Sequence, residues 1–252
     1  MKMKKRSDII EFLTCIFFPN RCIFCGSLLP ANEESLCDEC RENLPWIKGD
    51  ICFRCGAAKS DCSCKGRLGG FYDGISSVFY YDENVKECIH RFKFNSDKYA
   101  SFELARLMSD TCAERYADVQ FDYVAYVPME RKRQSRRGYN QSRLLAQYIS
   151  VNRNIPFGDK LIEKIYSTEI QHQQSEIERK GNLLGAFDIN PKYDIADKTV
   201  LLIDDVKTSG ATINECGKML YLRGAKQVFC LTTALVNSKI DENTDETEEV
   251  PC

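Results

Sequence analysis

Two adjacent carboxylates, Asp204 and Asp205, stand directly before a turn that combines hydroxyl groups with a glycine. This phosphate turn consists of Lys207, Thr208, Ser209, Gly210, Ala211 and Thr212. Where such a turn opens a helix, its backbone N–H groups and hydroxyls can bind a phosphate dianion. The carboxylates can accept hydrogen bonds from vicinal sugar hydroxyls, or share a cation such as Mg²⁺ with the phosphate. Together they indicate a sugar phosphate as the ligand.

Other interpretations of the acid pair are weaker. Two carboxylates after a strand could simply cap the next helix. A receiver domain also pairs acids at a strand end, but there they follow the first strand of the domain, whereas these come late in it. A nucleotide-binding P-loop would need G-x-x-x-x-G-K-[ST], which this sequence lacks.

A second group of residues is strongly basic. Six cations crowd between positions 131 and 143, namely Arg131, Lys132, Arg133, Arg136, Arg137 and Arg143. A local cluster of this kind predicts an anionic ligand, because guanidinium groups suit phosphate oxygens. The alternatives are a solvated helix-start face and a patch that binds nucleic acid.

Cysteines form the third group. Of the 14 in the chain, eight form four close pairs near the N-terminus: Cys22/Cys25, Cys37/Cys40, Cys52/Cys55 and Cys62/Cys64. A C-x-x-C pair presents two thiolates to one Zn²⁺, and two pairs complete a tetrahedral shell. Disulfides would need an oxidising compartment, and scattered thiols would not pair so regularly. The spacing therefore predicts two closed, structural zinc sites, with sequential and interleaved pairing both open.

The remaining pattern predicts the elements that position these groups. Buried strands are expected at 76–81, 123–127, 199–203 and 227–236, with helices at 83–94, 98–116, 140–151 and 211–221. Strands that alternate with helices indicate a parallel α/β sheet. We predict a leader helix over 1–20, a double zinc-ribbon module over 21–68, the α/β domain over 69–238 and an acidic disordered tail over 239–252.

Composition sets the outer limits. The chain has 252 residues, 43% of them hydrophobic, which supports a packed core and excludes wholesale disorder. No apolar run approaches the roughly 20 residues that span a bilayer. The apolar stretch at 9–18 is interrupted by Glu11 and no cleavage site follows it, so we expect a cytoplasmic protein.

These motifs resemble a known family. The stretch from Leu202 to Thr212 is similar to the phosphoribosyl diphosphate signature of type I phosphoribosyltransferases. The further matches are Val127-Pro-Met, Arg131-Lys-Arg133, Arg137-Gly-Tyr-Asn-Gln141, Gln171, Ser175, Arg179, Asn182 and Gly185-Ala-Phe187. With the cysteine-rich start, they resemble the ComF family of competence-associated phosphoribosyltransferase-like proteins, from about residue 18 to Val236. The resemblance implies a type I phosphoribosyltransferase-like parallel sheet flanked by helices, behind the zinc module.

The resemblance also implies roles for the residues. Phosphoribosyl diphosphate, with Mg²⁺, would lie between the phosphate turn and a loop over Val127–Arg133. Asp204 and Asp205 would hold the ribose hydroxyls, Arg131 and Arg133 would take the charge of the leaving diphosphate, and Arg137 and Asn140 would belong to a loop that closes over the ligand.

Three functional hypotheses follow. The first is a phosphoribosyltransferase that releases diphosphate and attaches ribose phosphate to an unidentified acceptor. The second is a binding protein that serves DNA uptake, in which the zinc module and the Arg131–Arg143 surface hold single-stranded DNA or a competence helicase or translocation partner, with phosphoribosyl diphosphate as a regulator or relic. The third, a purely structural adaptor, is disfavoured by the complete phosphate turn.

Overall fold

The structure is a computed structural model, which describes residues 21–30, 35–64, 70–94, 98–165 and 186–237. The predicted leader helix, the predicted acidic tail and the matched positions between Gln171 and Gly185 lie outside the described residues. Among the residues that are described, no helix is both long enough and apolar enough to cross a membrane.

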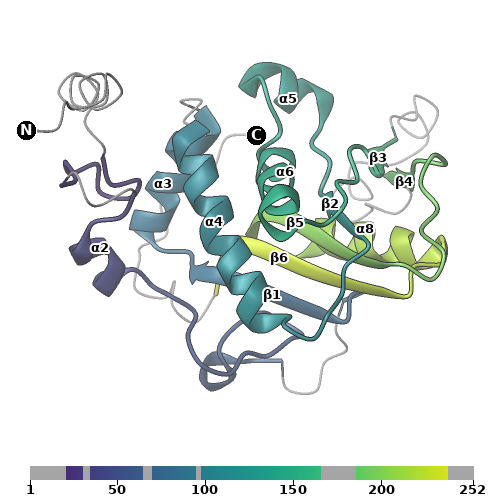
Figure 1. Ribbon diagram of the computed structural model, residues 1–252, viewed down its shortest axis with the longest axis horizontal. Helices are drawn as coiled ribbons and strands as arrows, with labels where there is room; N and C mark the ends of the chain where they lie inside the picture. Colours follow the sequence, from purple (N-terminus) through teal and green to yellow (C-terminus); the bar gives the residue numbers. More distant parts are fainter. Residues whose placement is uncertain (1–20, 31–34, 65–69, 95–97, 166–185, 238–252) are drawn as a thin grey trace, which may run out of the picture.

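A four-stranded parallel sheet forms the centre of the molecule (Figure 1). Its strands, in spatial order, are β1 (Gly74–Tyr80), β6 (Gln227–Leu235), β5 (Thr199–Lys207) and β2 (Tyr123–Tyr126). Every neighbouring pair is parallel, with Ile75 opposite Cys230 and Leu202 opposite both Cys230 and Ala125. Because helices cover both faces, the strands are apolar runs rather than alternating patterns. This confirms the predicted α/β class.

Helices pack on the two faces of this sheet (Figure 1). The helices α4 (Lys98–Arg115) and α6 (Gln141–Arg153) cover one face, and α3 (Glu83–Phe94) joins the same core. On the other face, α8 (Ala211–Leu222) packs against β5 and β6. The sequence pattern places Leu104, Leu107, Met108 and Cys112 on one face of α4, and Ile213, Cys216 and Leu220 on the inner face of α8; all are buried except Leu107, which is half-buried.

Several short elements were not predicted. A separate two-stranded antiparallel sheet pairs β3 (Ile162–Lys164) with β4 (Phe187–Ile189), and α2 (Asp38–Asn43) and the 3₁₀ turn η1 (Lys59–Asp61) lie within the zinc module. Elements of three to six residues are too short to show a hydrophobic period. The helix α5 (Arg131–Arg137) also replaces the end of the loop expected over Val127–Arg133. Its seven residues are all polar, so the sequence has no hydrophobic periodicity from which this helix could be predicted.

Strand β5 is longer than its sequence pattern predicts. The expected strand ends at Ile203, where burial on both faces also ends, but pairing with β6 continues as far as Lys207 opposite Leu235. Asp204 and Asp205 therefore belong to the last part of the strand rather than to the turn after it. The rigid sheet, not a loop, sets their position.

The zinc module packs against the α/β domain instead of standing apart. Phe24 meets Phe79 of β1 edge to face, with ring centroids 5.3 Å apart, and Trp46 packs on the same ring at 4.5 Å. The Arg91 guanidinium of α3 donates to the carbonyl oxygens of Ile23 and Phe24, at 2.5 and 2.6 Å. Phe24 and Trp46 thus pack the zinc module against the α/β domain.

The segment around Trp46 also covers the outer edge of β1. The Ile47 amide donates to the Val78 carbonyl at 3.0 Å, and the Tyr80 amide donates to the Pro45 carbonyl at 2.8 Å. An uncovered edge strand invites pairing with another chain. The module therefore completes the sheet as well as enlarging its core.

Gly217 of α8 permits a close approach that any larger residue would prevent. A Cβ atom at this position would lie 2.0 Å from the Phe71 carbonyl oxygen, which is backbone and cannot swing away. We expect Gly217→Ala to lower the free energy of unfolding by about 1–3 kcal/mol, despite the better helix propensity of alanine. Urea denaturation measures this. Lys218→Ala, one residue along the same helix, is the control and should change stability by less than about 0.5 kcal/mol.

Candidate phosphate and zinc sites

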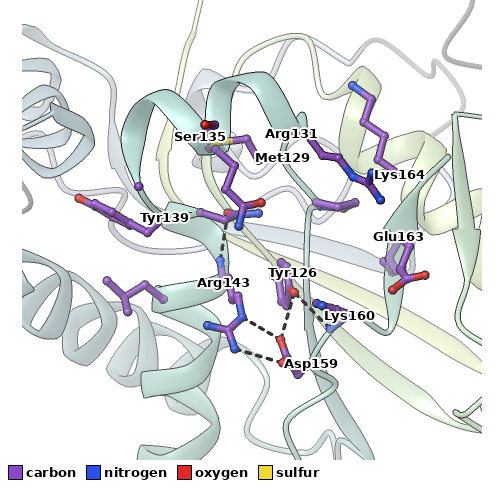
Figure 2. Close-up of a pocket in the computed structure, with 16 residues that line it drawn as sticks. Tyr126, Met129, Arg131, Ser135, Tyr139, Arg143, Asp159, Lys160, Glu163 and Lys164 are labelled. Carbon is purple, nitrogen blue, oxygen red and sulfur yellow. Dashed lines mark hydrogen bonds and ion pairs between the residues drawn. The ribbon is translucent and has the colours of Figure 1, made fainter. Parts of the chain in front are cut away.

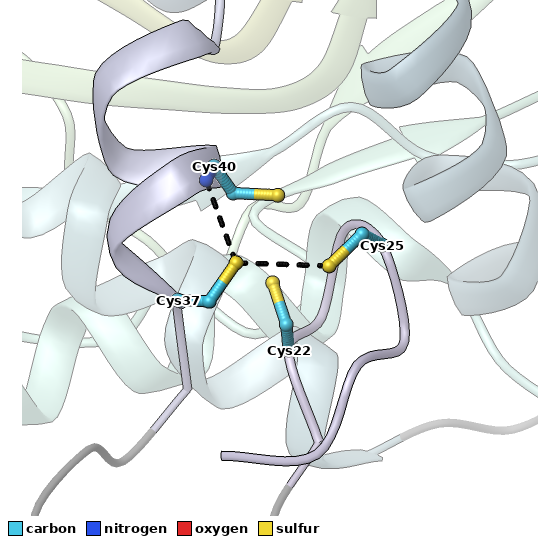
Figure 3. Close-up of side chains that lie close together, drawn as sticks. All are labelled: Cys22, Cys25, Cys37 and Cys40. Carbon is cyan, nitrogen blue, oxygen red and sulfur yellow. Dashed lines mark hydrogen bonds between the residues drawn. The ribbon is translucent and has the colours of Figure 1, made fainter. Parts of the chain in front are cut away.

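The eight paired cysteines gather into two clusters of four (Figure 3 shows the first). The first cluster is Cys22, Cys25, Cys37 and Cys40; the second cluster is Cys52, Cys55, Cys62 and Cys64. In each, the sulfur atoms lie within 4.8 Å of one another. The pairing is therefore sequential.

The distances in these clusters match a metal rather than disulfides. Cys25 Sγ lies 3.7 Å from Cys37 Sγ, and Cys55 Sγ lies 3.8 Å from Cys62 Sγ. Tetrahedral zinc with bonds of about 2.3 Å separates its sulfur ligands by about 3.8 Å, whereas a disulfide needs about 2.05 Å. Both clusters fit structural zinc, and four thiolates leave no open position for catalysis.

The same turn builds the first half of each cluster. The amide of Gly26 donates to the Cys22 carbonyl at 2.9 Å, and the amide of Gly56 donates to the Cys52 carbonyl at 2.8 Å. Both glycines have positive φ, 76° and 87°, which glycine adopts without a Cβ penalty. This explains why a glycine follows the second cysteine in these two pairs.

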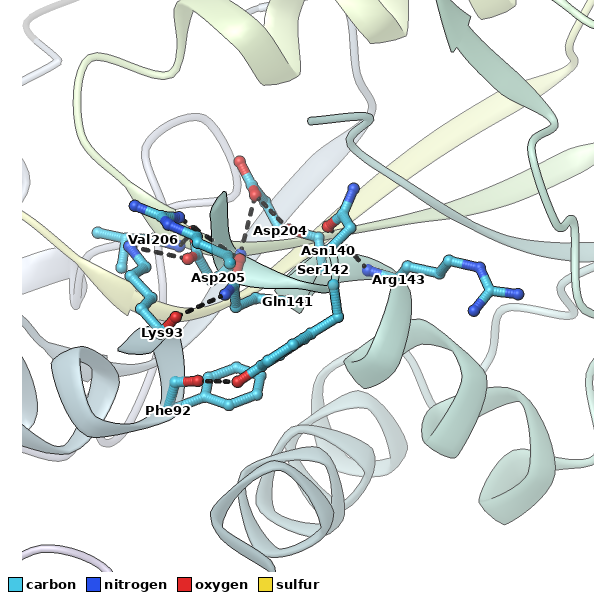
Figure 4. Close-up of polar contacts among 11 residues, drawn as sticks. Phe92, Lys93, Asn140, Gln141, Ser142, Arg143, Asp204, Asp205 and Val206 are labelled. Atoms are coloured by element: carbon cyan, nitrogen blue, oxygen red, sulfur yellow. Dashed lines mark hydrogen bonds and ion pairs between the residues drawn. The ribbon is translucent and has the colours of Figure 1, made fainter. Parts of the chain in front are cut away.

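The two carboxylates at the end of β5 have different partners (Figure 4). Asp204 Oδ1 accepts from the Ser142 hydroxyl at 2.8 Å and from the Asp205 amide at 2.9 Å. Asp205 forms an ion pair with Lys93 Nζ at 2.8 Å, and both side chains are largely covered, 16% and 22% exposed. Ser142 lies in the first turn of α6 and Lys93 in the last turn of α3, so helices distant in sequence hold the acid pair. Sequence reasoning missed both residues, because nothing local to either indicates the contact.

The carboxyl group of Asp204 has a pKa close to neutral pH. Burial, reinforced by the negative charge of Asp205, raises the pKa of Asp204 to about 7. The Ser142 hydroxyl and the Asp205 amide act in the opposite direction but do not cancel that effect. A carboxyl group in this state shares a proton readily and gains from the arrival of hydrogen-bond donors or a cation.

The phosphate turn joins β5 to α8. Gly210 occupies the N-cap of α8 with φ 75°, and no side chain caps the helix there. The Ala211 amide makes only a long contact of 3.4 Å with Ser209 Oγ. Thr208 and Ser209 are exposed, while Lys207 is half-buried. The amides of the first turn are thus available to an anion, and the helix dipole favours one.

The predicted cationic residues Arg131, Arg133 and Arg137 all lie on α5. Arg131 and Arg133 are exposed, and Arg131 lines a cavity of about 950 Å³ (Figure 2). Arg137 is half-buried and donates to Gln141 Oε1 over 3.5 Å.

Asn140 serves the framework. It is buried, its amide group donates to the Val127 carbonyl at 3.1 Å, and its oxygen accepts from the Arg143 amide at 3.2 Å. It thereby caps α6 and ties that helix to the segment after β2. The structure brings Asn140 beside the acid pair, with its side chain committed to these two bonds.

An ion pair that the sequence did not reveal forms one wall of the large cavity (Figure 2). Arg143 donates to both oxygens of Asp159, at 2.8 and 3.1 Å, and the Tyr126 hydroxyl donates to Asp159 at 3.1 Å. The hydrogen bonds from Arg143 lower the pKa of Asp159, with burial opposing them. Arg143, one of the six clustered cations, is therefore already paired with a carboxylate. Lys160 and Lys164, which lie outside the cluster in sequence, also line the cavity.

This arrangement defines a class of protein. The parallel sheet, the acid pair at the end of a central strand and the glycine-containing turn form a type I phosphoribosyltransferase-like domain, preceded by a double zinc ribbon. Family models agree with this assignment, because a double zinc ribbon domain matches residues 13–67 and a phosphoribosyl transferase domain matches residues 136–250.

Relatives cover most of the chain. Competence protein F of Haemophilus influenzae is 30% identical over 84% of this chain and 95% of its own length. Competence protein ComFC of Bacillus subtilis is 30% identical over 76% of this chain and 80% of its own. The DNA utilization protein YhgH of Salmonella typhimurium is 29% identical over 86% of this chain and 98% of its own length. The chain belongs to the ComF family of competence and DNA utilization proteins.

The raised pKa of Asp204 predicts how stability depends on pH. The folded pKa, about 7, lies above the unfolded value of about 3.9, so the folded state retains a proton longer and stability from this group is lost as pH rises from 4 to 7. Asp204→Asn keeps the acceptor oxygen and has no proton to lose. We expect the free energy of unfolding of the variant to exceed that of the parent by about 1–3 kcal/mol at pH 8 and to equal it at pH 4.

Urea denaturation at the two pH values measures this difference. Asp118→Asn, at an exposed position on the turn after α4, is the matched control, and its free energy of unfolding should stay within about 0.5 kcal/mol of the parent's. If Asp204→Asn raises the free energy of unfolding by the same amount at pH 4 and pH 8, the raised pKa of Asp204 would be contradicted.

Proposed function

We propose that the protein binds phosphoribosyl diphosphate at the carboxyl end of β5. The observation that carries the proposal is the placement of an acid pair, fixed in the sheet, shortly before an uncapped helix terminus that a glycine opens. Ligands of parallel α/β sheets bind outside the carboxyl ends of the strands. The turn would take the 5-phosphate, and Asp204 and Asp205 would accept from the ribose hydroxyls.

The diphosphate end of the ligand would face α5 and the large cavity. Arg131 and Arg133 lie on the exposed surface of a helix that lacks acidic residues, and Arg131 reaches the cavity wall. Guanidinium groups can neutralise the charge that develops on a departing diphosphate, which is the main catalytic requirement for cleaving a ribosyl–oxygen bond.

Mg²⁺ fits this site by its chemistry. It prefers carboxylate, phosphate and water oxygens, and Asp204 and Asp205 supply the carboxylates beside the proposed diphosphate. When bound, the ion would add its charge to that of the arginines. The chain's own contribution is to fix the two carboxylates, through Ser142 and Lys93, before the ligand arrives.

The biological setting that we propose is the handling of incoming DNA in the cytoplasm. Membership of a family whose relatives are called competence and DNA utilization proteins supports this setting. Transfer of ribose phosphate to an acceptor is the activity that the site favours. An assay of diphosphate release, with nucleobases, nucleotides and oligonucleotides as candidate acceptors, distinguishes transfer from binding alone.

Removing the charge of Asp205 tests the ligand directly. Asp205→Asn loses one hydrogen-bond acceptor for the ribose and releases Lys93 from its ion pair. We expect the affinity for phosphoribosyl diphosphate with Mg²⁺, measured by calorimetry, to fall at least tenfold, or about 1.4 kcal/mol. Asp118→Asn is the control and should bind as the parent does. Unchanged affinity in Asp205→Asn would remove the sugar-binding role.

A second function is favoured by the exposure of α5. Five of its seven residues are cationic, and Arg131, Lys132, Arg133 and Arg136 are exposed together. A short, dense cationic surface of this kind suits the backbone of single-stranded DNA, and the same surface could present that DNA to a helicase or translocation partner.

The salt dependence of DNA binding tests this second function. We expect Arg131→Gln combined with Arg133→Gln to lower the affinity for a single-stranded oligonucleotide. It should also reduce the slope of log K against log salt by about 1.4, because each phosphate contact on a single strand contributes about 0.7. Fluorescence anisotropy at several salt concentrations measures both effects, with Lys192→Gln and Lys226→Gln together as the control. If the salt dependence of DNA binding does not change, Arg131 and Arg133 do not contact DNA, and only their proposed role in binding diphosphate remains.

A further inference from the structure

A second, smaller hollow lies where the zinc module meets the phosphate turn. Its volume is about 380 Å³. One wall comes from the second cluster, with Arg54 and Cys64, and the opposite wall comes from the phosphate turn, with Lys207, Ser209 and Ala211. The second cluster is therefore not remote from the proposed ligand site, although its four thiolates have no catalytic position to offer.

The hollow is suited to an anion. Arg54 and Lys207 are both among its lining residues, and none of the described residues that line it is an aspartate or a glutamate. Lys207 is half-buried and lines the hollow together with Cys64 of the second cluster. Ser209 and the backbone around Gly210 add hydrogen-bond donors on the same side. Two cations and several donors thus face one cavity from two modules.

The second cluster fixes where Arg54 lies. Arg54 stands between Cys52 and Cys55, in the turn that the metal would hold closed. The Tyr72 hydroxyl donates to the Arg54 carbonyl at 2.8 Å, and the Ile75 amide donates to the neighbouring Phe53 carbonyl at 2.9 Å. The backbone on both sides of Arg54 is therefore tied to β1 and the segment before it. Its position depends on the cysteine cluster and on the sheet.

The first cluster makes no comparable approach. Its turn is bound by Arg91 of α3, through the carbonyls of Ile23 and Phe24, and three of its four cysteines, Cys22, Cys37 and Cys40, join the core formed with α3 and β1. None of its cysteines lines the hollow. The two clusters therefore provide a comparison within one chain, because they share ligands and geometry but differ in their neighbours.

We propose that the second cysteine cluster is part of the ligand site: Arg54, held by that cluster, binds the phosphate monoester of the sugar phosphate together with Lys207. The inference rests on the proposed function, since it assumes that the phosphate turn receives a phosphate. It adds a binding residue from the zinc module and gives the second metal site a role in affinity that the first does not have.

Calorimetry of the full-length chain with ribose 5-phosphate tests the proposal. We expect Arg54→Gln to retain two zinc equivalents and the parent's circular dichroism, but to bind at least tenfold more weakly, because a guanidinium–phosphate contact is lost. Arg41→Gln is the matched control, since Arg41 follows a cysteine of the first cluster and is exposed. It should bind as the parent does. Parental affinity in Arg54→Gln would overturn the inference and leave the proposed function intact.

A second pair of variants tests the dependence on the cluster. Cys64→Ser and Cys40→Ser each remove one ligand, and each should lose one zinc equivalent. We expect the affinity for ribose 5-phosphate to fall at least tenfold in Cys64→Ser and less than twofold in Cys40→Ser. Equal losses in the two variants would overturn the specific role of the second cluster. If the parent protein binds phosphoribosyl diphosphate but not ribose 5-phosphate, this inference fails and the proposed function stands; if it binds neither, both fail.

Discussion

The position of two carboxylates in the last part of β5 is the constraint on which the candidate site depends. Like charges on adjacent residues repel, and burial makes their repulsion more costly. The protein meets this cost with different partners for the two groups: Ser142 and a backbone amide for Asp204, and the Lys93 ammonium for Asp205. The pKa of Asp204 nevertheless stays raised, to about 7. Residues kept in an unfavourable state by a rigid framework are common at functional sites.

The helices around β5 supply the partners that the two carboxylates need. α3 ends at the acid pair with Lys93, and α6 begins there with Ser142, while Asn140 fixes the start of α6 to the segment after β2. The cationic helix α5 lies between that segment and α6, and the phosphate turn leads into α8 on the other side. The acid pair and the phosphate turn, which are neighbours in sequence, thus share one end of the sheet with the cationic surface of α5, which comes from a separate part of the chain.

The zinc module contributes more than a separate small fold. A module of this length has too few aliphatic residues for a core of its own, so metal and the neighbouring domain must stabilise it. Phe24 and Trp46 pack on Phe79, and the segment from Pro45 to Ile47 covers the edge of β1. The two cysteine clusters consequently face different surroundings, the first against α3 and the second against the phosphate turn.

Features that depend on local spacing could be predicted from the order of the residues alone. Paired cysteines predicted two four-thiolate clusters, and apolar runs predicted the strands and the buried faces of α4 and α8. Order along the chain identified the acid pair and the phosphate turn, because these residues are neighbours in sequence as well as in space. Only the tertiary structure decided which distant groups meet them. Ser142 lies 62 positions from Asp204, and Arg143 lies 16 from Asp159, and no periodicity encodes such contacts. The extension of β5 to Lys207 and the placement of Arg54 in the same hollow as that lysine also follow from pairing between strands and packing between modules, which arise only when the chain folds.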